Sequence, residues 1–196
     1  MLPENVIYLT IVSAIVGYSL YFKDIFYGET RPNLVSWFLW ALPPLLGTFF
    51  QLKAGAGFSA LPVFIAGFGP LLVVAVLLWN RNSYFKINIL DIICGTLSII
   101  ALVFYIFTLN LGISIMFAIL SDALATVPTL VKTWKFPETE TPSVYLSWIF
   151  NNTLGLLIIK NWIFPIYSFG TYLVLINLAI VFCIYHKRIF RISATI

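Results

Sequence analysis

The chain has 196 residues, of which 61% are hydrophobic and only 9% are charged, and its formal net charge is +4. Soluble domains carry about 25% charged residues, so this composition excludes a water-soluble globule, and an aromatic content of 17% excludes a disordered chain. The net charge is small and no basic run exists, which excludes a nucleic-acid-binding protein. An all-α integral membrane protein remains.

Seven segments are apolar over the roughly 20 residues that a membrane-spanning helix needs. In chain order, the expected spans are 5–22, 33–50, 60–79, 87–108, 110–131, 143–159 and 163–185. Short loops with turn residues connect them and leave no length for a soluble domain. Cys94 and Cys183 both fall within spans, so we expect packing residues rather than a disulfide.

The placement of basic residues predicts the orientation. Short cytoplasmic loops are enriched in Lys and Arg. Nine of the eleven basic residues fall on one side of the seven spans: Lys23, Arg31, Arg81, Lys86, Lys132, Lys135, Lys187, Arg188 and Arg191. Only Lys53 and Lys160 fall on the other side. We therefore expect the N-terminus outside the cell membrane and the C-terminus in the cytoplasm, with no cleavable signal peptide because the first residues lack a positive charge.

Short identities recur at a shift of 111 residues and predict an internal repeat. Glu29-Thr30 matches Glu140-Thr141, Ser36-Trp37 matches Ser147-Trp148, and Leu45-Leu46 matches Leu156-Leu157. The expected plan is a three-helix unit at 1–82, a connector helix at 83–109 and a second three-helix unit at 110–196 with a short basic tail. An odd number of spans between the copies makes them parallel repeats, related by an axis along the membrane normal.

This 3+1+3 plan resembles the PQ-loop and SWEET-like transporter superfamily. The resemblance is greatest over residues 122–134 (DALATVPTLVKTW) and 143–148 (SVYLSW), where Pro128-Thr129 stands in place of the family's Pro-Gln pair. The chain also resembles a group of small uncharacterised bacterial seven-span proteins, which implies a bacterial inner membrane. The resemblance further implies proline hinges, for which this chain offers Pro128, Pro43 and Pro44.

Polar side chains from several spans are expected at one depth. With a rise of about 1.5 Å per residue, Asp122, Asn151, Asn152 and Asn177 fall in one layer near the midplane, and Trp40 falls close to it. Ionisable residues inside a bilayer are costly and mark a pathway or a pair. The predicted substrate-binding residues are Asp122, Asn151, Asn152, Trp40, Trp148, Asn177 and Trp37. We expect Asp122 to face a polar cavity between the units, with asparagine amides as its donors.

Each of these residues also has a structural interpretation. Asp122 could bond a neighbouring helix or Thr126, and Trp37 and Trp148 could be interfacial belt tryptophans. Asn151 and Asn152 lie about 100° apart on a helix, so at most one faces a cavity squarely. Asp91 lies close to the inner face, where we expect a structural role, and a pair with Lys86 is one way to fill it.

The sequence offers little for catalysis. We expect the single histidine, His186, at a solvated edge beside Lys187-Arg188, and no Cys, His and Asp cluster has metal-ligand spacing. The last span contains no lysine, which excludes a retinal Schiff base. We therefore expect no enzyme, no metal and no cofactor.

The leading hypothesis is a carrier, either a facilitator or proton-coupled, that moves a small polar solute by alternating access between the two units. Asp122 would bind a proton or a cationic group. The alternatives are a membrane receptor or regulatory protein of the same fold that binds a ligand without moving it and, less favoured, a lipid-modifying enzyme. The expected partners are the solute, protons and the lipid bilayer.

Overall fold

The computed structural model describes residues 6–53, 61–80, 84–108, 111–159 and 162–192. Within these ranges the chain is all-helical and contains no strand. The helices are α1 (Ile7–Phe26), α2 (Leu34–Lys53), α3 (Leu61–Trp79), α4 (Ile89–Phe107), α5 (Leu111–Lys135), the short 3-10 helix η3 (Pro137–Thr139), α6 (Ser143–Leu157) and α7 (Phe164–Ile192). Of the basic residues that predict orientation, Arg81 and Lys160 lie outside the described residues, as do the side chains of Lys53 and Arg191.

Four of these helices are long and apolar enough to cross a membrane, over the stretches Tyr8–Phe26, Ile89–Phe107, Gly112–Lys135 and Ile166–Ile189. Among the described residues, α2 and α3 contribute shorter apolar stretches, Leu34–Leu45 and Phe64–Trp79. The fold is therefore that of a helical membrane protein. The full set of seven spans stays a prediction.

Large apolar side chains cover the outside of the bundle. On α4 the outward residues include Ile92, Ile99, Val103 and Phe104, each between 45% and 56% exposed. Soluble monomers rarely present contiguous apolar surface on this scale. A lipid environment accounts for this surface, because acyl chains need no polar partner.

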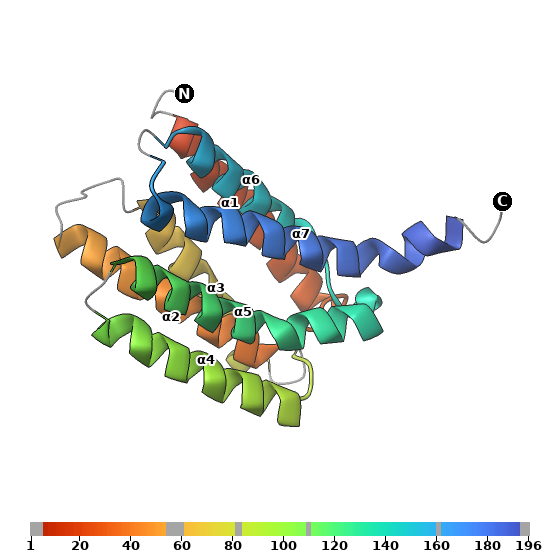
Figure 1. Cartoon of the computed structure of the whole chain (residues 1–196). Coiled ribbons are helices and arrows are strands. Elements are labelled where there is room, and N and C mark those ends of the chain that lie inside the picture. The colour runs from red at the N-terminus through yellow and green to blue at the C-terminus, as the bar shows by residue number, and fades with distance from the viewer. Residues whose placement is uncertain (1–5, 54–60, 81–83, 109–110, 160–161, 193–196) are drawn as a thin grey trace.

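The helices lie side by side in a bundle, with α4 along one outer edge (Figure 1). Three pairs of neighbours along the chain pack together, α2 with α3, α4 with α5 and α6 with α7. Two further contacts connect distant parts of the sequence, α1 with α6 and α2 with α5. The central helices of the bundle thus meet across sequence separations of about a hundred residues.

The start of α4 is fixed by a reciprocal cap. The Asn88 side chain accepts from the backbone N–H groups of Leu90 and Asp91, while Asp91 Oδ2 accepts from the Asn88 N–H at 2.6 Å. Asp91 Oδ1 accepts from Asn33 Nδ2 at 2.7 Å, which ties α4 to the start of α2. Asp91 is fully buried and has the expected structural role, but its partners are the cap and Asn33 and not the exposed Lys86. The cap and Asn33 already use both carboxylate oxygens.

A buried ion pair closes the end of the bundle that carries the loops at 27–33 and 136–142. Lys132 forms a salt bridge with Glu140, which also accepts from the hydroxyl of Tyr21 on α1. Lys132 Nζ further donates to the backbone carbonyl of Arg31 at 2.8 Å. Lys132 was expected in a solvated loop, but α5 continues through it to Lys135, and the side chain is only 3% exposed.

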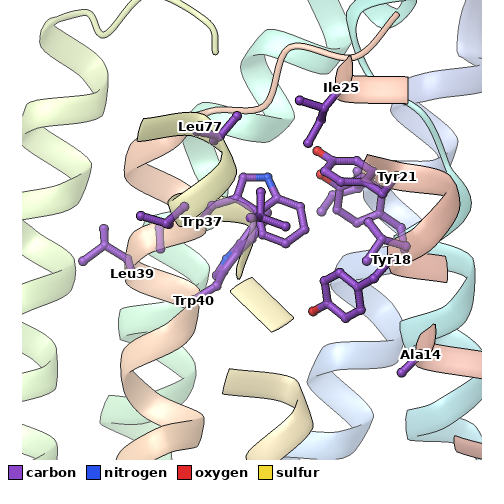
Figure 2. Close-up of a cluster of buried hydrophobic side chains, with 14 of the residues drawn as sticks. Ala14, Tyr18, Tyr21, Ile25, Trp37, Leu39, Trp40 and Leu77 are labelled. Carbon is purple, nitrogen blue, oxygen red and sulfur yellow. The ribbon is translucent and has the colours of Figure 1, made fainter. Parts of the chain in front are cut away.

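The core beside this end consists of aromatic rings. We call Tyr18, Tyr21, Trp37, Trp40, Tyr145 and Trp148 the aromatic cluster; they come from α1, α2 and α6. Figure 2 shows Tyr18, Tyr21, Trp37 and Trp40. The Trp37 ring lies 5.3 Å from Trp40 and 5.5 Å from Trp148, between centroids. Trp37 is fully buried, so the belt interpretation of this residue is wrong, because its indole packs inside the protein.

The far end of α7 also differs from expectation. His186 was expected at a solvated edge, but it is only 7% exposed and stacks on Trp134 of α5 with 4.1 Å between ring centroids. This burial follows because α5 and α7 both extend beyond the predicted spans and pack on each other. Cys94 and Cys183 are buried and free, as predicted.

Candidate functional site

A cavity lies among helices from both halves of the chain. It holds about 470 Å³ of space free of protein atoms, with its open mouth counted in. The lining comes from α2, α3, α5, α6 and α7: Trp40, Pro44, Ala66, Asp122, Thr126, Trp148, Asn152, Phe169, Leu173, Ile176, Asn177 and Ile180. Most of these side chains are apolar, and the few polar ones are concentrated on α5, α6 and α7.

The cavity brings together most of the predicted binding residues. Asp122, Asn152, Asn177, Trp40 and Trp148 all line it, although they are far apart in sequence. Two predicted residues are not part of the lining that the structure describes. Trp37 lies in the aromatic cluster, and Asn151 is the neighbour of Asn152, turned to another side of α6. Of the predicted hinge prolines, Pro44 lines the cavity, while Pro43 and Pro128 lie inside α2 and α5.

Asp122 is the carboxyl group of the cavity and is 5% exposed. Its Oδ2 accepts a hydrogen bond of 2.8 Å from the hydroxyl of Tyr172 on α7. Its backbone carbonyl accepts from Thr126 Oγ1, one turn later, at 2.8 Å. Thr126 Oγ1 in turn accepts from Trp40 Nε1 at 3.0 Å. This chain of hydrogen bonds joins α2, α5 and α7 around the carboxyl.

The asparagines play a different role from the expected one. Asn152 Nδ2 donates to the Trp148 carbonyl at 2.8 Å, and Asn177 Nδ2 donates to the Leu173 carbonyl at 2.7 Å. Both amides thus donate to their own helix one turn back, so the prediction that they supply the donors for Asp122 is wrong. The amide oxygen of Asn177 is buried and has no hydrogen-bond partner within the described part of the chain.

One end of the cavity is filled by rings. Trp40 and Trp148 belong both to the lining and to the aromatic cluster. Trp37 and Tyr145 lie about one turn nearer the starts of α2 and α6, which are the ends of these helices beside the loops. The aromatic cluster and the Lys132–Glu140 pair therefore separate the cavity from the loop end of the bundle.

The cavity carries one acidic group and no basic one. The lining contains Asp122 but no Lys, Arg or His. Every Lys and Arg whose side chain the structure describes lies at the loop end: Lys23, Arg31, Lys86, Lys132, Lys135, Lys187 and Arg188. Within the described ranges, no three His, Cys, Asp or Glu side chains come together to hold a metal ion.

Sequence reasoning missed Tyr172, the donor to Asp122. At about 1.5 Å per residue, Tyr172 lies roughly 12 Å into α7 and Asp122 roughly 16 Å into α5 from the same side, so the depth argument could have paired them. A tyrosine hydroxyl at this depth is common in helix packing and does not by itself indicate a site. Thr126 and the apolar lining from Phe169 to Ile180 carried no signal that distinguishes them from ordinary helix packing.

Comparison of the chain with protein-family models, with curated protein sequences and with solved structures found no match. The site is therefore interpreted from its own geometry.

Proposed function

We propose that this chain is a membrane carrier, a facilitator or proton-coupled, for a small polar solute, and a relative of the PQ-loop and SWEET-like transporters. The observation that carries the proposal is the cavity, in which a buried carboxyl, two asparagines and two tryptophans from distant helices meet. Ionisable groups that face a cavity inside the membrane mark solute and proton paths. Secondary transporters bind their solutes between structural repeats near the midplane.

Contacts between equivalent residues support the two-unit plan. Thr30 and Thr141 differ by 111 residues, and their hydroxyl oxygens are 3.0 Å apart. Trp37 and Trp148 differ by the same shift, and their rings are in contact. In a two-fold arrangement, a residue beside the axis meets its own equivalent. These two pairs support an axis between a unit of α1–α3 and a unit of α5–α7.

Two mirrored hydrogen bonds support the same plan. Ser36 Oγ on α2 donates to the carbonyl of Ala125 on α5 at 2.6 Å. The equivalent serine, Ser147 on α6, donates to the carbonyl of Ser13 on α1 at 2.9 Å. In each unit, the second helix thus reaches the first helix of the other unit. This exchange leaves α4 outside the symmetric set, in the role of connector.

Alternating access would arise from rocking of the two units around the cavity, with the N-terminus outside and the C-terminus in the cytoplasm of a bacterial cell. The aromatic cluster and the Lys132–Glu140 pair close the loop end, which is cytoplasmic in the proposed orientation, so a carrier of this kind would here be closed to the cytoplasm. Pro128 lacks the N–H that would bond the Leu124 carbonyl, and Pro43 and Pro44 weaken α2 in the same way. These positions are the proposed hinges.

The closed end also favours a second candidate, a receptor or regulatory protein that binds a ligand and never opens to the cytoplasm. The specific observation is the burial of Trp37, Lys132 and Glu140, which a permanent seal would require.

A two-step experiment tests the proposal. Purified protein is screened by thermal shift against sugars, amino acids, vitamins, nucleosides and amines, and each stabilising compound is then offered to proteoliposomes. A carrier accumulates or equilibrates such a compound across the membrane. An Asn177→Leu variant should lose both the thermal stabilisation and the transport. A compound that stabilises the protein but never crosses the membrane would instead identify a receptor.

A further inference from the structure

We infer that the cavity takes a small protonated primary amine with an apolar or aromatic body. This inference rests on the proposed function in one respect, namely that the cavity is the solute site. It adds the class of solute, and it follows from which hydrogen-bonding atoms of the lining are still free.

Several polar donors of the cavity lining are already engaged. Trp40 Nε1 donates to Thr126, and Thr126 donates to the carbonyl of Asp122. The amide nitrogens of Asn152 and Asn177 donate to carbonyls of their own helices. Each amide keeps a second N–H, and a solute rich in acceptor oxygens would have to break these bonds to use the other donors.

The acceptors are not all engaged. Asn177 Oδ1 is buried without a partner within the described residues, and Asn177 as a whole is 2% exposed. An ionised carboxylate offers about four lone-pair positions, and the side chain of Asp122 has one hydrogen bond, from Tyr172. A buried acceptor without a donor is costly, so the solute itself is the natural source of N–H groups. A primary ammonium group has three donors and no acceptor, which matches this need.

The walls suit the remainder of such a molecule. Trp40, Trp148 and Phe169 present aromatic rings, whose faces attract cations. Leu173, Ile176 and Ile180 add aliphatic surface along α7 that can cover a hydrocarbon body. The polar groups therefore select the charge, and the apolar ones the shape.

The same lining disfavours other polar solutes. A carboxylate or phosphate would meet Asp122 with no Lys, Arg or His in the lining to compensate the repulsion. An amino acid in its zwitterionic form brings such a carboxylate with it. A sugar needs several donors as well as acceptors from its site, and here the Trp40 indole, the Thr126 hydroxyl and one N–H of each asparagine amide are in use.

The experiment compares four probes of similar size on the full chain in lipid nanodiscs: phenethylamine, 2-phenylethanol, phenylalanine and glucose. Binding is followed by tryptophan fluorescence, because Trp40 and Trp148 line the cavity. We expect saturable binding of phenethylamine alone. The Asp122→Asn variant should bind it about tenfold more weakly or worse, since a hydrogen bond to a charged group is lost. The matched control is Glu138→Gln, which removes an exposed carboxylate at the loop end and should leave the affinity unchanged.

The outcomes separate this inference from the proposed function. Tight binding of 2-phenylethanol, phenylalanine or glucose in preference to the amine, or equal affinity of the parent and Asp122→Asn, would overturn the amine inference and leave a carrier possible. Amine binding that depends on Asp122, without uptake into proteoliposomes, would support the inference and overturn the carrier. Failure of phenethylamine to bind would overturn the inference.

Discussion

A carboxyl group buried between membrane helices must either hold a proton or find donors, because its charged form loses its hydration there. Asp122 lines the cavity, and among the described residues its side chain has one donor, Tyr172. The polar groups that line the cavity from the neighbouring helices, Trp40 of α2, Asn152 of α6 and Asn177 of α7, are uncharged. Within the described residues, Tyr172 is the only other titratable group placed against the Asp122 carboxyl. No other charged group therefore fixes the charge of Asp122, and we expect that charge to change with solute binding and with pH.

The first prediction concerns the pH dependence of binding. A cationic solute binds the ionised carboxylate, so its affinity should rise as the pH rises through the range in which Asp122 loses its proton. Asp122→Asn keeps the shape of the side chain but cannot ionise, so the affinity should become both weaker and independent of pH. Titration of binding between pH 5 and 9 measures this effect, with Glu138→Gln as the control. An unchanged pH profile in Asp122→Asn would assign the response to another group.

Depth arguments from the sequence identified several residues of the site because the cavity lies in one layer of the bundle. Asp122, Asn152, Asn177, Trp40 and Trp148 share that layer and line the cavity. Depth says nothing about rotation around a helix axis, which is why Asn151 was included. It also could not show that the asparagine amides bond their own helices, because that choice depends on local side-chain geometry.

At the scale of the elements, the proposed two-unit plan makes the contacts of α2 and α6 equivalent. The bonds from Ser36 and Ser147 are the clearest pair, since one joins α2 to α5 and the other joins α6 to α1. The aromatic cluster lies between these helices and fills the space around Trp37 and Trp148.

The second prediction follows from this equivalence. Ser36→Ala and Ser147→Ala should each lower the free energy of unfolding by about 0.5–1.5 kcal/mol, since each removes a buried hydrogen bond to a backbone carbonyl. Thr96→Ala is the control, because Thr96 is exposed and bonds only the Ile92 carbonyl of its own helix. Thermal unfolding in detergent measures the differences. A large loss for one serine and none for the other would argue against equivalent roles.

The third prediction concerns the closed end. Glu140→Gln leaves the buried Lys132 ammonium without its counter-ion, which costs about 3–5 kcal/mol for a pair this deeply buried. The protein should unfold at a clearly lower temperature. The double variant Lys132→Met with Glu140→Gln should recover most of the loss, because no unpaired charge remains. Equal stability of Glu140→Gln and the parent would mean that the pair does not hold this end together.

Most helix positions could be predicted from apolar run lengths, since the described helices start within a few residues of the expected spans. The helix ends beside the loops could not be predicted in this way. The expected span at 110–131 continues as α5 to Lys135, because Lys132 forms a buried salt bridge with Glu140. Likewise, α1 continues to Phe26, beyond the expected end at residue 22. Such extensions depend on partners elsewhere in the chain, which local hydropathy does not contain.

At the scale of the whole molecule, the basic side chains and the acidic cavity lie in different parts of the bundle. The described basic side chains gather at the loop end, whereas the cavity holds a single acidic group behind the aromatic cluster. This asymmetry is the basis of the proposed orientation, with the loop end in the cytoplasm.

The fourth prediction tests that orientation. A reporter that is active only in the cytoplasm should be active when fused after residue 196 and inactive when inserted after residue 57, between α2 and α3. The reason is that short segments rich in Lys and Arg stay on the cytoplasmic side of the membrane, and these residues are concentrated at the loop end. An inactive fusion after residue 196, with the protein present in the membrane, would reverse the proposed topology.

The central claim is that the cavity opens alternately to both sides of the membrane, and two neighbouring residues of α7 allow a direct test. Ile176 lines the cavity, while Leu175 is 62% exposed on the outer, lipid-facing surface. Each is changed to cysteine in a chain whose buried Cys94 and Cys183 are replaced by alanine, and a membrane-impermeant thiol reagent is applied to right-side-out and to inverted vesicles. A carrier predicts that Ile176→Cys reacts from both sides and Leu175→Cys from neither. Reaction of Ile176→Cys from one side only would contradict alternating access and identify a sealed receptor.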